Sequence, residues 1–266
     1  MKRILVTNDD GVHSEGIHLL AAALAPLGEV IVVAPHIEAS AIGHALTLRR
    51  PLRMDRLRDG VYEVDGTPTD CVNIALTQLY TAASWPDLIV SGINKGYNLG
   101  DDVTYSGTVA GAMEGAMLGI PSLAVSLERT ADAYDFGPAA AIAAMVVEAV
   151  LRGGLPARTF LNLNVPPGQP RGIRVTFQAK RNHVTVVNPR HDPRGRPYYW
   201  IEEGENEWEP NDRSDYQAVK DGFVSVTPLQ LDLTAHGAID GLEKLLDQQI
   251  TQRAEQLLLD PRIGVE

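Results

Sequence analysis

The sequence predicts an α/β fold in which helices cover both faces of a mostly parallel sheet. Two observations lead to this prediction. Short apolar runs typical of buried strands alternate with longer helical segments through the first two thirds of the chain. Helices that connect successive apolar strands imply parallel pairing, because the chain must cross over the sheet before it can add the next strand. Such a sheet is buried on both faces.

The expected elements follow one another closely along the chain. Residues 3–7 contain Ile4, Leu5 and Val6 and form the first expected strand. Further strands are expected at residues 29–34, 87–91, 122–126 and 159–165. Helices are expected between them at residues 17–27, 68–80, 106–118 and 139–151. Thr67 stands directly before Pro68 and is the expected N-cap of the second helix.

Two regions interrupt this alternation. Residues 46–65 are basic and strand-like, with Asp59-Gly60 as the expected hairpin turn. Residues 172–200 mix strand-like runs with Arg, Asn and Pro, and they lead into the acidic stretch 202–215. The second region has no evident core of its own and resembles an extended arm. Such a segment is best stabilised by burial against a second subunit, so we expect a homo-oligomer.

A last strand is expected at residues 223–227 and an amphipathic helix at about 238–259. These elements suggest three parts. They are a Rossmann-like catalytic core at residues 1–170 that includes the hairpin 46–65, an extended arm and strand with oligomer contacts at 171–236, and a C-terminal helix at 237–266.

Composition and charge exclude several classes of protein. The 266 residues carry 34 acidic and 23 basic side chains, and the net charge of −11 argues against binding of a nucleic acid polymer by charge. A single cysteine, Cys71, excludes an internal disulfide and a cysteine-rich zinc site. The longest apolar stretch, residues 138–147, is too short to span a bilayer, and the N-terminus lacks a signal-peptide core. We therefore expect a cytoplasmic protein with no membrane partner.

Candidate metal ligands follow three of the expected strands. The loops after residues 3–7, 29–34 and 87–91 contain Asp9 with Asp10, then Ser40, then Asn94. In an open parallel sheet such loops meet at one edge, where ligands bind. A divalent cation would remove the repulsion between two adjacent carboxylates, and carboxylate, hydroxyl and amide oxygens suit hard ions. The alternative is a solvated Asp-Asp-Gly turn that needs no metal.

A helix start supplies a candidate phosphate site. Ser106 can cap the helix that follows, Gly107 allows a ligand to approach the backbone closely, and Thr108 adds a hydroxyl. The free N–H groups of a helix N-terminus attract anions. A plain helix cap is the alternative interpretation of the same three residues.

Several motifs occur in order along nearly the whole chain. They are ILVTNDDG at residues 4–11, GTPTDCV at 66–72, SGIN at 91–94, YSGTV at 105–109 and SVTPL at 225–229. Together they resemble the SurE family, the survival protein E nucleotidases. One departure is visible: the family usually has glycine after the residue that corresponds to Ser40, whereas this chain has Ala41, which affects the local turn more than the ligand.

The resemblance implies a Rossmann-like core with an exchanged C-terminal arm, assembled as a homodimer or homotetramer. It also implies a 5′-nucleotidase that hydrolyses nucleoside monophosphates, with 3′-nucleotides and polyphosphate as further substrates of some members. One divalent ion per subunit, Mg²⁺ or Mn²⁺, would activate water. The implied metal ligands are Asp9, Asp10, Ser40 and Asn94, of which Asp9 or Asp10 also accepts the water's proton. We expect phosphate contacts from Asn98, Ser106, Gly107 and Thr108.

Two alternatives of other classes stay open at this point. A phosphatase with an aspartyl-phosphate intermediate would carry Asp-x-Asp after the first strand, whereas Asp9 and Asp10 are adjacent. A non-catalytic regulator could bind a nucleotide together with a metal through the same residues. A phosphoenzyme trap would test the first alternative, and turnover of p-nitrophenyl phosphate with and without metal would test the second.

Overall fold

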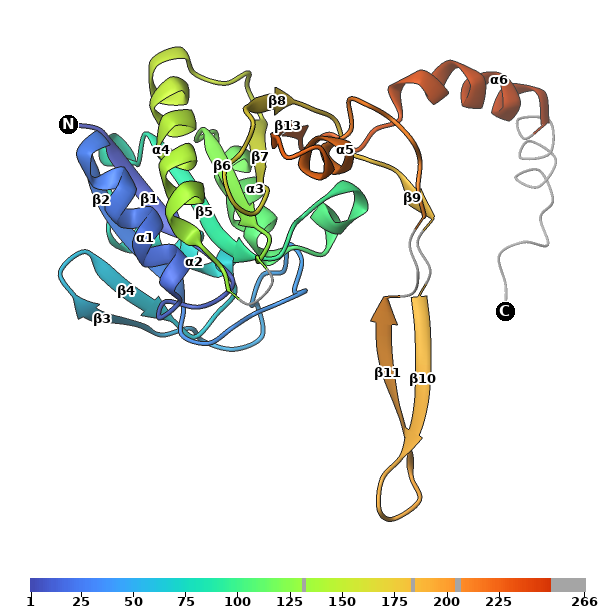
Figure 1. Cartoon of the computed structure of the whole chain (residues 1–266), viewed down its shortest axis with the longest axis horizontal. Helices are drawn as coiled ribbons and strands as arrows, with labels where there is room; N and C mark the ends of the chain where they lie inside the picture. Colours follow the sequence, from blue (N-terminus) through green and yellow to red (C-terminus); the bar gives the residue numbers. More distant parts are fainter. Residues whose placement is uncertain (131–132, 183–184, 204–206, 250–266) are drawn as a thin grey trace, which may run out of the picture. The chain divides into compact units, whose positions relative to one another are not determined.

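A nine-stranded sheet forms the framework of residues 1–231 in the computed structural model, which describes residues 1–130, 133–182, 185–203 and 207–249 (Figure 1). The strand order is β3-β4-β2-β1-β5-β6-β7-β13-β8. From β4 to β7 neighbouring strands run parallel, whereas β3 and β13 are antiparallel to β4 and β7. Helices flank this mostly parallel sheet, so the predicted α/β fold is confirmed.

The strands of this sheet are β1 (Arg3–Thr7), β2 (Glu29–Pro35), β3 (Met54–Arg58), β4 (Val61–Val64), β5 (Leu88–Lys95), β6 (Ser122–Leu127), β7 (Thr159–Val165), β8 (Ile173–Val175) and β13 (Val224–Gln230). The helices of residues 1–231 are α1 (Glu15–Leu24), α2 (Pro68–Gln78), α3 (Gly107–Met117), α4 (Phe136–Gly153) and α5 (Asp215–Lys220). Short 3₁₀ turns are η1 (Ala25–Leu27), η2 (Ala82–Ser84) and η3 (Gly100–Thr104). Two small antiparallel pairs are β10 (Thr185–His191) with β11 (Pro197–Glu203), and β9 (Arg181–Asn182) with β12 (Glu207–Trp208).

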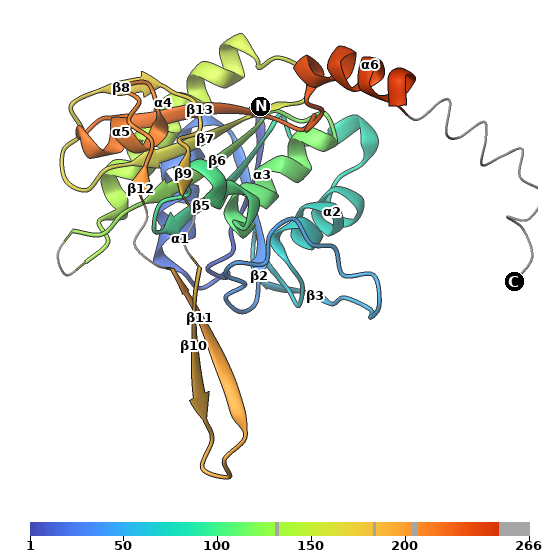
Figure 2. The same cartoon turned by 90° about the vertical axis from the view of Figure 1, so that its right-hand side faces the viewer.

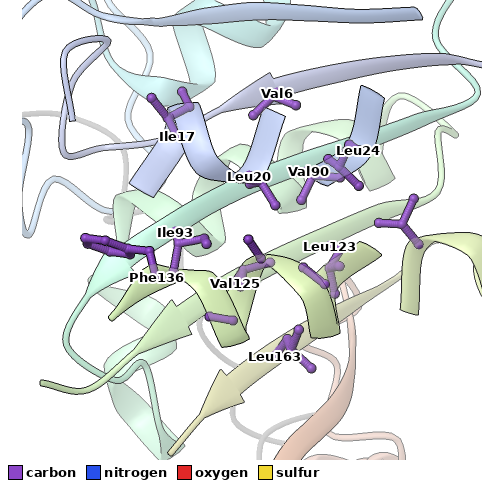
Figure 3. Close-up of a cluster of buried hydrophobic side chains, with 14 of the residues drawn as sticks. Val6, Ile17, Leu20, Leu24, Val90, Ile93, Leu123, Val125, Phe136 and Leu163 are labelled. Carbon is purple, nitrogen blue, oxygen red and sulfur yellow. The ribbon is translucent and has the colours of Figure 1, made fainter. Parts of the chain in front are cut away.

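Both faces of the sheet are apolar because side chains alternate along each strand. In β1, Ile4 and Val6 pack in the cluster that contains α1 and α4, whereas Leu5 packs in the cluster that contains α2. Helix α3 contributes to a third cluster. Figures 1 and 2 show α1 and α4 on one face of the sheet and α2 and α3 on the other. Figure 3 shows α1 residues such as Ile17 and Leu20 above the central strands.

The structure shifts several predicted helix boundaries. Helix α1 begins at Glu15 rather than at residue 17, and the side chain of Ser14 in the N-cap position forms no capping hydrogen bond. Helix α4 begins at Phe136 because the Asp135 side chain accepts a hydrogen bond from the Gly137 backbone and caps the helix. Thr67 caps α2, as expected, by accepting a hydrogen bond from the backbone of Asp70.

The region predicted as a basic hairpin contributes an edge to the main sheet. Strands β3 and β4 pair antiparallel around the turn at Gly60, which has φ of 69°, and β4 also pairs in parallel with β2. Residues 46–53, which belonged to the predicted hairpin region, form no strand. The C-terminal strand β13 likewise joins the main sheet, beside β7.

The second unit, residues 232–266, is described as far as residue 249. It contains the 3₁₀ turn η4 (His236–Ala238) and the helix α6 (Ile239–Gln249). The remainder of the helix predicted at 238–259 lies outside the described residues. The predicted division of the chain at residues 170 and 236 stays a prediction.

Within the described residues, α4 is the one helix long and apolar enough to cross a membrane. Its residues Ala139, Ala143 and Val147 are fully buried among the side chains of α1 and the sheet. Helix α4 thus packs one face against the sheet, while Met145 elsewhere on it is exposed.

Candidate active site

Two loops and the end of one strand carry the predicted metal ligands, and they meet at one edge of the sheet because β2, β1 and β5 are neighbours. The backbone N–H of Ala39 donates to the carbonyl oxygen of Asp9 at 2.8 Å, which joins the loop after β2 to the loop after β1. The backbone N–H of Lys95 donates to Oδ2 of Asp10 at 3.3 Å, which joins the end of β5 to the same loop. The structure therefore brings the loop residues Asp9, Asp10 and Ser40 together with Asn94, which lies within β5 because that strand continues to Lys95 rather than ending at residue 91 as predicted.

A cavity of about 720 Å³ opens at this edge. Five of the predicted site residues line it: Asp9, Ser40, Asn94, Asn98 and Ser106. The other three, Asp10, Gly107 and Thr108, lie outside the lining, although each contacts a residue that belongs to it. No histidine of the described residues lines this cavity. The structure instead pairs His44 with Glu114 on α3, at 2.7 Å between Nε2 and Oε2.

Asp9 is the most buried acid at the cavity, with 5% of its surface exposed. The hydroxyl of Thr108 donates a hydrogen bond to its Oδ1. Burial raises the pKa of Asp9 to about 6, and the neighbouring charge of Asp10 adds to the rise while the hydrogen bond from Thr108 opposes it. Burial also raises the pKa of Asp10, against the lowering effect of the Lys95 charge. Two carboxylates that are disfavoured as free anions provide a suitable setting for a bound cation.

Each of the two neutral predicted ligands donates a hydrogen bond within the chain. Nδ2 of Asn94 donates to the carbonyl oxygen of Gly96 at 2.9 Å, which fixes the orientation of the amide and leaves its Oδ1 as an acceptor. The hydroxyl of Ser40 donates to Oε1 of Glu38 at 2.5 Å, so the lone pairs of its oxygen stay available. Together with Asp9 and Asp10 this gives an all-oxygen donor set that fits Mg²⁺ or Mn²⁺.

The start of α3 is packed against Asp9. The hydroxyl of Ser106 accepts a hydrogen bond from the backbone of Val109 at 3.1 Å and thereby caps the helix. A Cβ atom on Gly107 would lie 2.8 Å from Cβ and 2.9 Å from Oδ2 of Asp9. Glycine is thus required here by a side chain of this chain, before any ligand is considered. The contacts of these residues with phosphate stay a prediction.

A family model described as Survival protein SurE matches residues 4–185.

The chain belongs to the SurE family.

Among its SurE relatives, the 5′-nucleotidase SurE of Syntrophotalea carbinolica is 53% identical over 242 residues, which cover 91% of this chain and 96% of that protein. The 5′-nucleotidase SurE of Pelobacter propionicus is 54% identical over 239 residues, which cover 89% of this chain and 96% of that protein. A crystal structure of the SurE protein from Aquifex aeolicus aligns with a TM-score of 0.81 and 44% identity, over 91% of this chain and 99% of that one. The predicted family is therefore confirmed, and nucleotidases of this family depend on a metal ion.

The departure from the SurE pattern at Ala41 has a structural counterpart. Ala41 has φ of 54°, in the left-handed region that favours glycine. The backbone therefore keeps the conformation that glycine adopts readily, and Ser40 still lines the cavity. Alanine is strained in this conformation, whereas glycine adopts it without strain.

Sequence reasoning missed three polar residues that surround Asn98. Asn162 and Asn164 on β7 and Ser126 on β6 are all fully buried, and each forms a hydrogen bond with Asn98. The spacing of the two asparagines was a usable signal. They occupy alternate positions of an otherwise apolar strand, so both point to the same face, where a buried amide needs a partner.

Proposed function

We propose that this chain is a metal-dependent phosphomonoesterase that converts nucleoside monophosphates to nucleoside and phosphate, with 5′-nucleotides as substrates. One divalent ion per subunit, Mg²⁺ or Mn²⁺, is held by two carboxylates and two neutral oxygens. These ligands are Asp9, Asp10, Ser40 and Asn94. The phosphate lies against Asn98 and the start of α3 at Ser106, Gly107 and Thr108.

The main support for this function is the chemistry of the four proposed metal ligands, which all offer oxygen atoms. A buried carboxylate stands beside a second carboxylate, and the Ser40 and Asn94 side chains each donate a hydrogen bond within the chain while their oxygens can still accept. The arrangement leaves acceptor atoms, which is what a hard cation requires. The SurE relatives named above are 5′-nucleotidases, which confirms the prediction of an enzyme of this class and favours neither the aspartyl-phosphate nor the regulator alternative.

The chain's own residues have separate parts in the proposed reaction. A bound divalent ion supplies Lewis-acid chemistry: it neutralises phosphoryl charge and lowers the pKa of a water. Asp9 and Asp10 hold the ion, and one of them accepts the proton of the attacking water. Thr108 keeps Asp9 in place through the hydrogen bond to its Oδ1. Asn98 and the backbone at the start of α3 hold the phosphate oxygens, which gain charge in the transition state.

The finer parts of the proposal concern substrate range, location and assembly. We extend it to 3′-nucleotides and polyphosphate as further substrates, to the cytoplasm as location, and to a homodimer or homotetramer. The hairpin β10–β11 supports an oligomer because Tyr199, Trp200 and Ile201 expose 62%, 55% and 76% of their surfaces. Light scattering that gives a clean 28.8 kDa monomer at micromolar concentration would contradict the assembly.

Release of inorganic phosphate tests the activity. The substrates are the four 5′-mononucleotides, a 3′-mononucleotide and polyphosphate, each assayed with Mg²⁺, with Mn²⁺ and after EDTA treatment. We expect metal-dependent release from 5′-mononucleotides. Asp10→Asn should lose most activity and bind Mn²⁺ more weakly in calorimetry, because it removes one charge from the donor set.

Asp59→Asn is the matched control. The side chain of Asp59 is almost fully exposed in the β3–β4 turn, so this substitution should leave the rate of phosphate release and the Mn²⁺ affinity unchanged. Full activity after exhaustive EDTA treatment, or normal Mn²⁺ affinity and turnover in Asp10→Asn, would contradict the proposed function.

A further inference from the structure

We propose that Asn164 is a positioning residue that fixes Asn98 at the cavity, and that Ser126 completes this function by orienting the Asn98 side chain. The inference rests on the proposed function, because it takes Asn98 as a phosphate contact. It adds two residues that lie behind the cavity wall and do not line it.

The backbone of Asn98 lies beyond the end of β5, where no strand pairing satisfies its N–H and C=O groups. Asn98 is nevertheless buried, with 6% of its surface exposed, so these groups need partners. Its N–H donates to Oδ1 of Asn164 at 2.9 Å. Its carbonyl oxygen accepts from Nδ2 of Asn164 at 3.1 Å and from Nδ2 of Asn162 at 2.8 Å.

The side-chain amide of Asn164 therefore does what a neighbouring strand would do. It accepts a hydrogen bond from the N–H of Asn98 and donates one to its C=O. Only Asn and Gln combine a planar donor and acceptor in this way, and Asn has the shorter reach. An aspartate in this position would lose the donor, and an aliphatic side chain would leave the N–H of Asn98 buried and unpaired.

Asn164 is itself held rigidly. It is fully buried in β7, and its backbone is paired on one side with Ser126 of β6 and on the other with Ser225 of β13. A side chain from the middle of a sheet is placed more accurately than one from a loop. The loop residue Asn98 thus takes its position from the sheet.

Ser126 acts on the other end of Asn98. Nδ2 of Asn98 donates to Oγ of Ser126 at 2.7 Å, and Ser126 is fully buried. An amide nitrogen carries two hydrogens, so one remains for an oxygen in the cavity that Asn98 lines. Backbone and side chain of Asn98 are therefore both fixed before a ligand arrives, which lowers the entropy cost of binding and aligns the donor.

The test compares three variants of the full chain with wild type. Asn164→Leu removes both hydrogen bonds at similar volume, and Ser126→Ala removes only the hydroxyl. Thr176→Val is the matched control, because the buried hydroxyl of Thr176 bonds to the hydroxyls of Ser225 and Thr227 rather than to Asn98. For each variant, kcat and KM for a 5′-mononucleotide, the inhibition constant of inorganic phosphate and the Mn²⁺ dissociation constant are measured.

We expect Asn164→Leu and Ser126→Ala to lower kcat/KM at least tenfold and to weaken inhibition by phosphate, with Mn²⁺ affinity within twofold of wild type. Thr176→Val should match wild type in all three. Folded variants with wild-type kcat/KM and phosphate inhibition would overturn the inference, and so would a parallel loss of Mn²⁺ affinity, which indicates a general collapse of the site. If Asn164→Leu does not fold, the kcat/KM and phosphate inhibition of Ser126→Ala test the inference: wild-type values would overturn it.

Failure of the proposed function gives a different result. In that case wild type itself releases no phosphate with any metal. Direct calorimetric binding of inorganic phosphate to wild type and to Ser126→Ala then still tests the positioning of Asn98, since equal affinities would overturn it and a weaker affinity in the variant would support it.

Discussion

Gly107→Ala is a sensitive test of how α3 and Asp9 depend on each other. Sequence alone suggests that a side chain here would obstruct the phosphate while metal affinity is kept. The structure changes that expectation, because the added Cβ would lie 2.8 Å from Cβ and 2.9 Å from Oδ2 of Asp9. The variant should therefore weaken metal binding as well as catalysis.

The size of the effect follows from these distances. Ordinary carbon contacts begin near 3.4 Å, so Asp9 and α3 must separate by about half an ångström. Residues of a working site must be held within about 0.5 Å of their productive positions, and a metal ligand displaced this far is at that limit. A misplacement of about 1 Å lowers the rate about a hundredfold. We expect kcat/KM to fall about tenfold to a hundredfold. Overpacking should cost about 1–3 kcal/mol of folding free energy, partly offset by the better helix propensity of alanine, about 1 kcal/mol.

Calorimetric titration with Mn²⁺, phosphate release and urea unfolding measure the three quantities. Gly137→Ala is the matched control: Gly137 also lies in the first turn of a helix, but its added Cβ would meet only Oδ1 of Asp135, at 3.4 Å. That variant should keep wild-type metal affinity and activity. A folded Gly107→Ala with unchanged Mn²⁺ affinity and turnover would refute the reasoning.

Further predictions concern the turn at Ala41, the buried acid Glu114 and the metal. Ala41→Gly should raise the free energy of unfolding by roughly 0.5–1 kcal/mol in urea titrations and leave KM unchanged. The substitution removes the backbone strain of alanine in the left-handed region, and this gain exceeds the cost of the greater conformational entropy of glycine in the unfolded state. Burial alone would raise the pKa of Glu114, but hydrogen bonds from His44 and Asn73 hold it below its usual value. A lowered folded-state pKa stabilises the fold above the unfolded-state pKa, about 4.3, and this contribution is lost as pH falls through the lowered value. Glu114→Gln should therefore unfold at lower urea concentration at pH 7, and its difference from wild type should close on acidification below about pH 4; a constant difference would contradict this. EDTA treatment should lower the melting temperature of wild type and Mn²⁺ should restore it, since a ligand that binds the folded chain stabilises it; equal melting temperatures would count against the site.

The parts of the fold that depend on local pattern could be predicted, and those that depend on distant partners could not. The strands and the helices between them follow from apolar runs, and Thr67 caps α2 as its sequence position suggests. The place of β13 beside β7 depends on pairing between segments far apart in the chain, which periodicity does not report. The helix start at Phe136 was missed by three residues because the cap at Asp135 extends α4 beyond its predicted start, whereas the start of α1 at Glu15, two residues early, has no side-chain cap.

The same division holds for the candidate site. Asp9 and Ser40 come from loops after neighbouring strands and Asn94 from the carboxyl end of a third, so the rule for parallel sheets was enough to group them. That Thr108 donates to Asp9 depends instead on how closely α3 approaches the sheet. The partners of Asn98 belong to strands far along the chain, and although the alternating asparagines of β7 signal a buried polar contact, they do not identify Asn98 as the residue they bind.

The place of β13 also has a consequence for the order in which the protein can form during synthesis. Strand β7 pairs with β6, which precedes it, and with β13, which the ribosome makes much later. A nascent chain that has folded as far as β7 therefore presents an unpaired strand edge, with Leu161 and Leu163 on it, until Val224–Gln230 emerges. Truncation before β13 should consequently yield an aggregation-prone product, even though every loop that carries a proposed metal ligand would already be present.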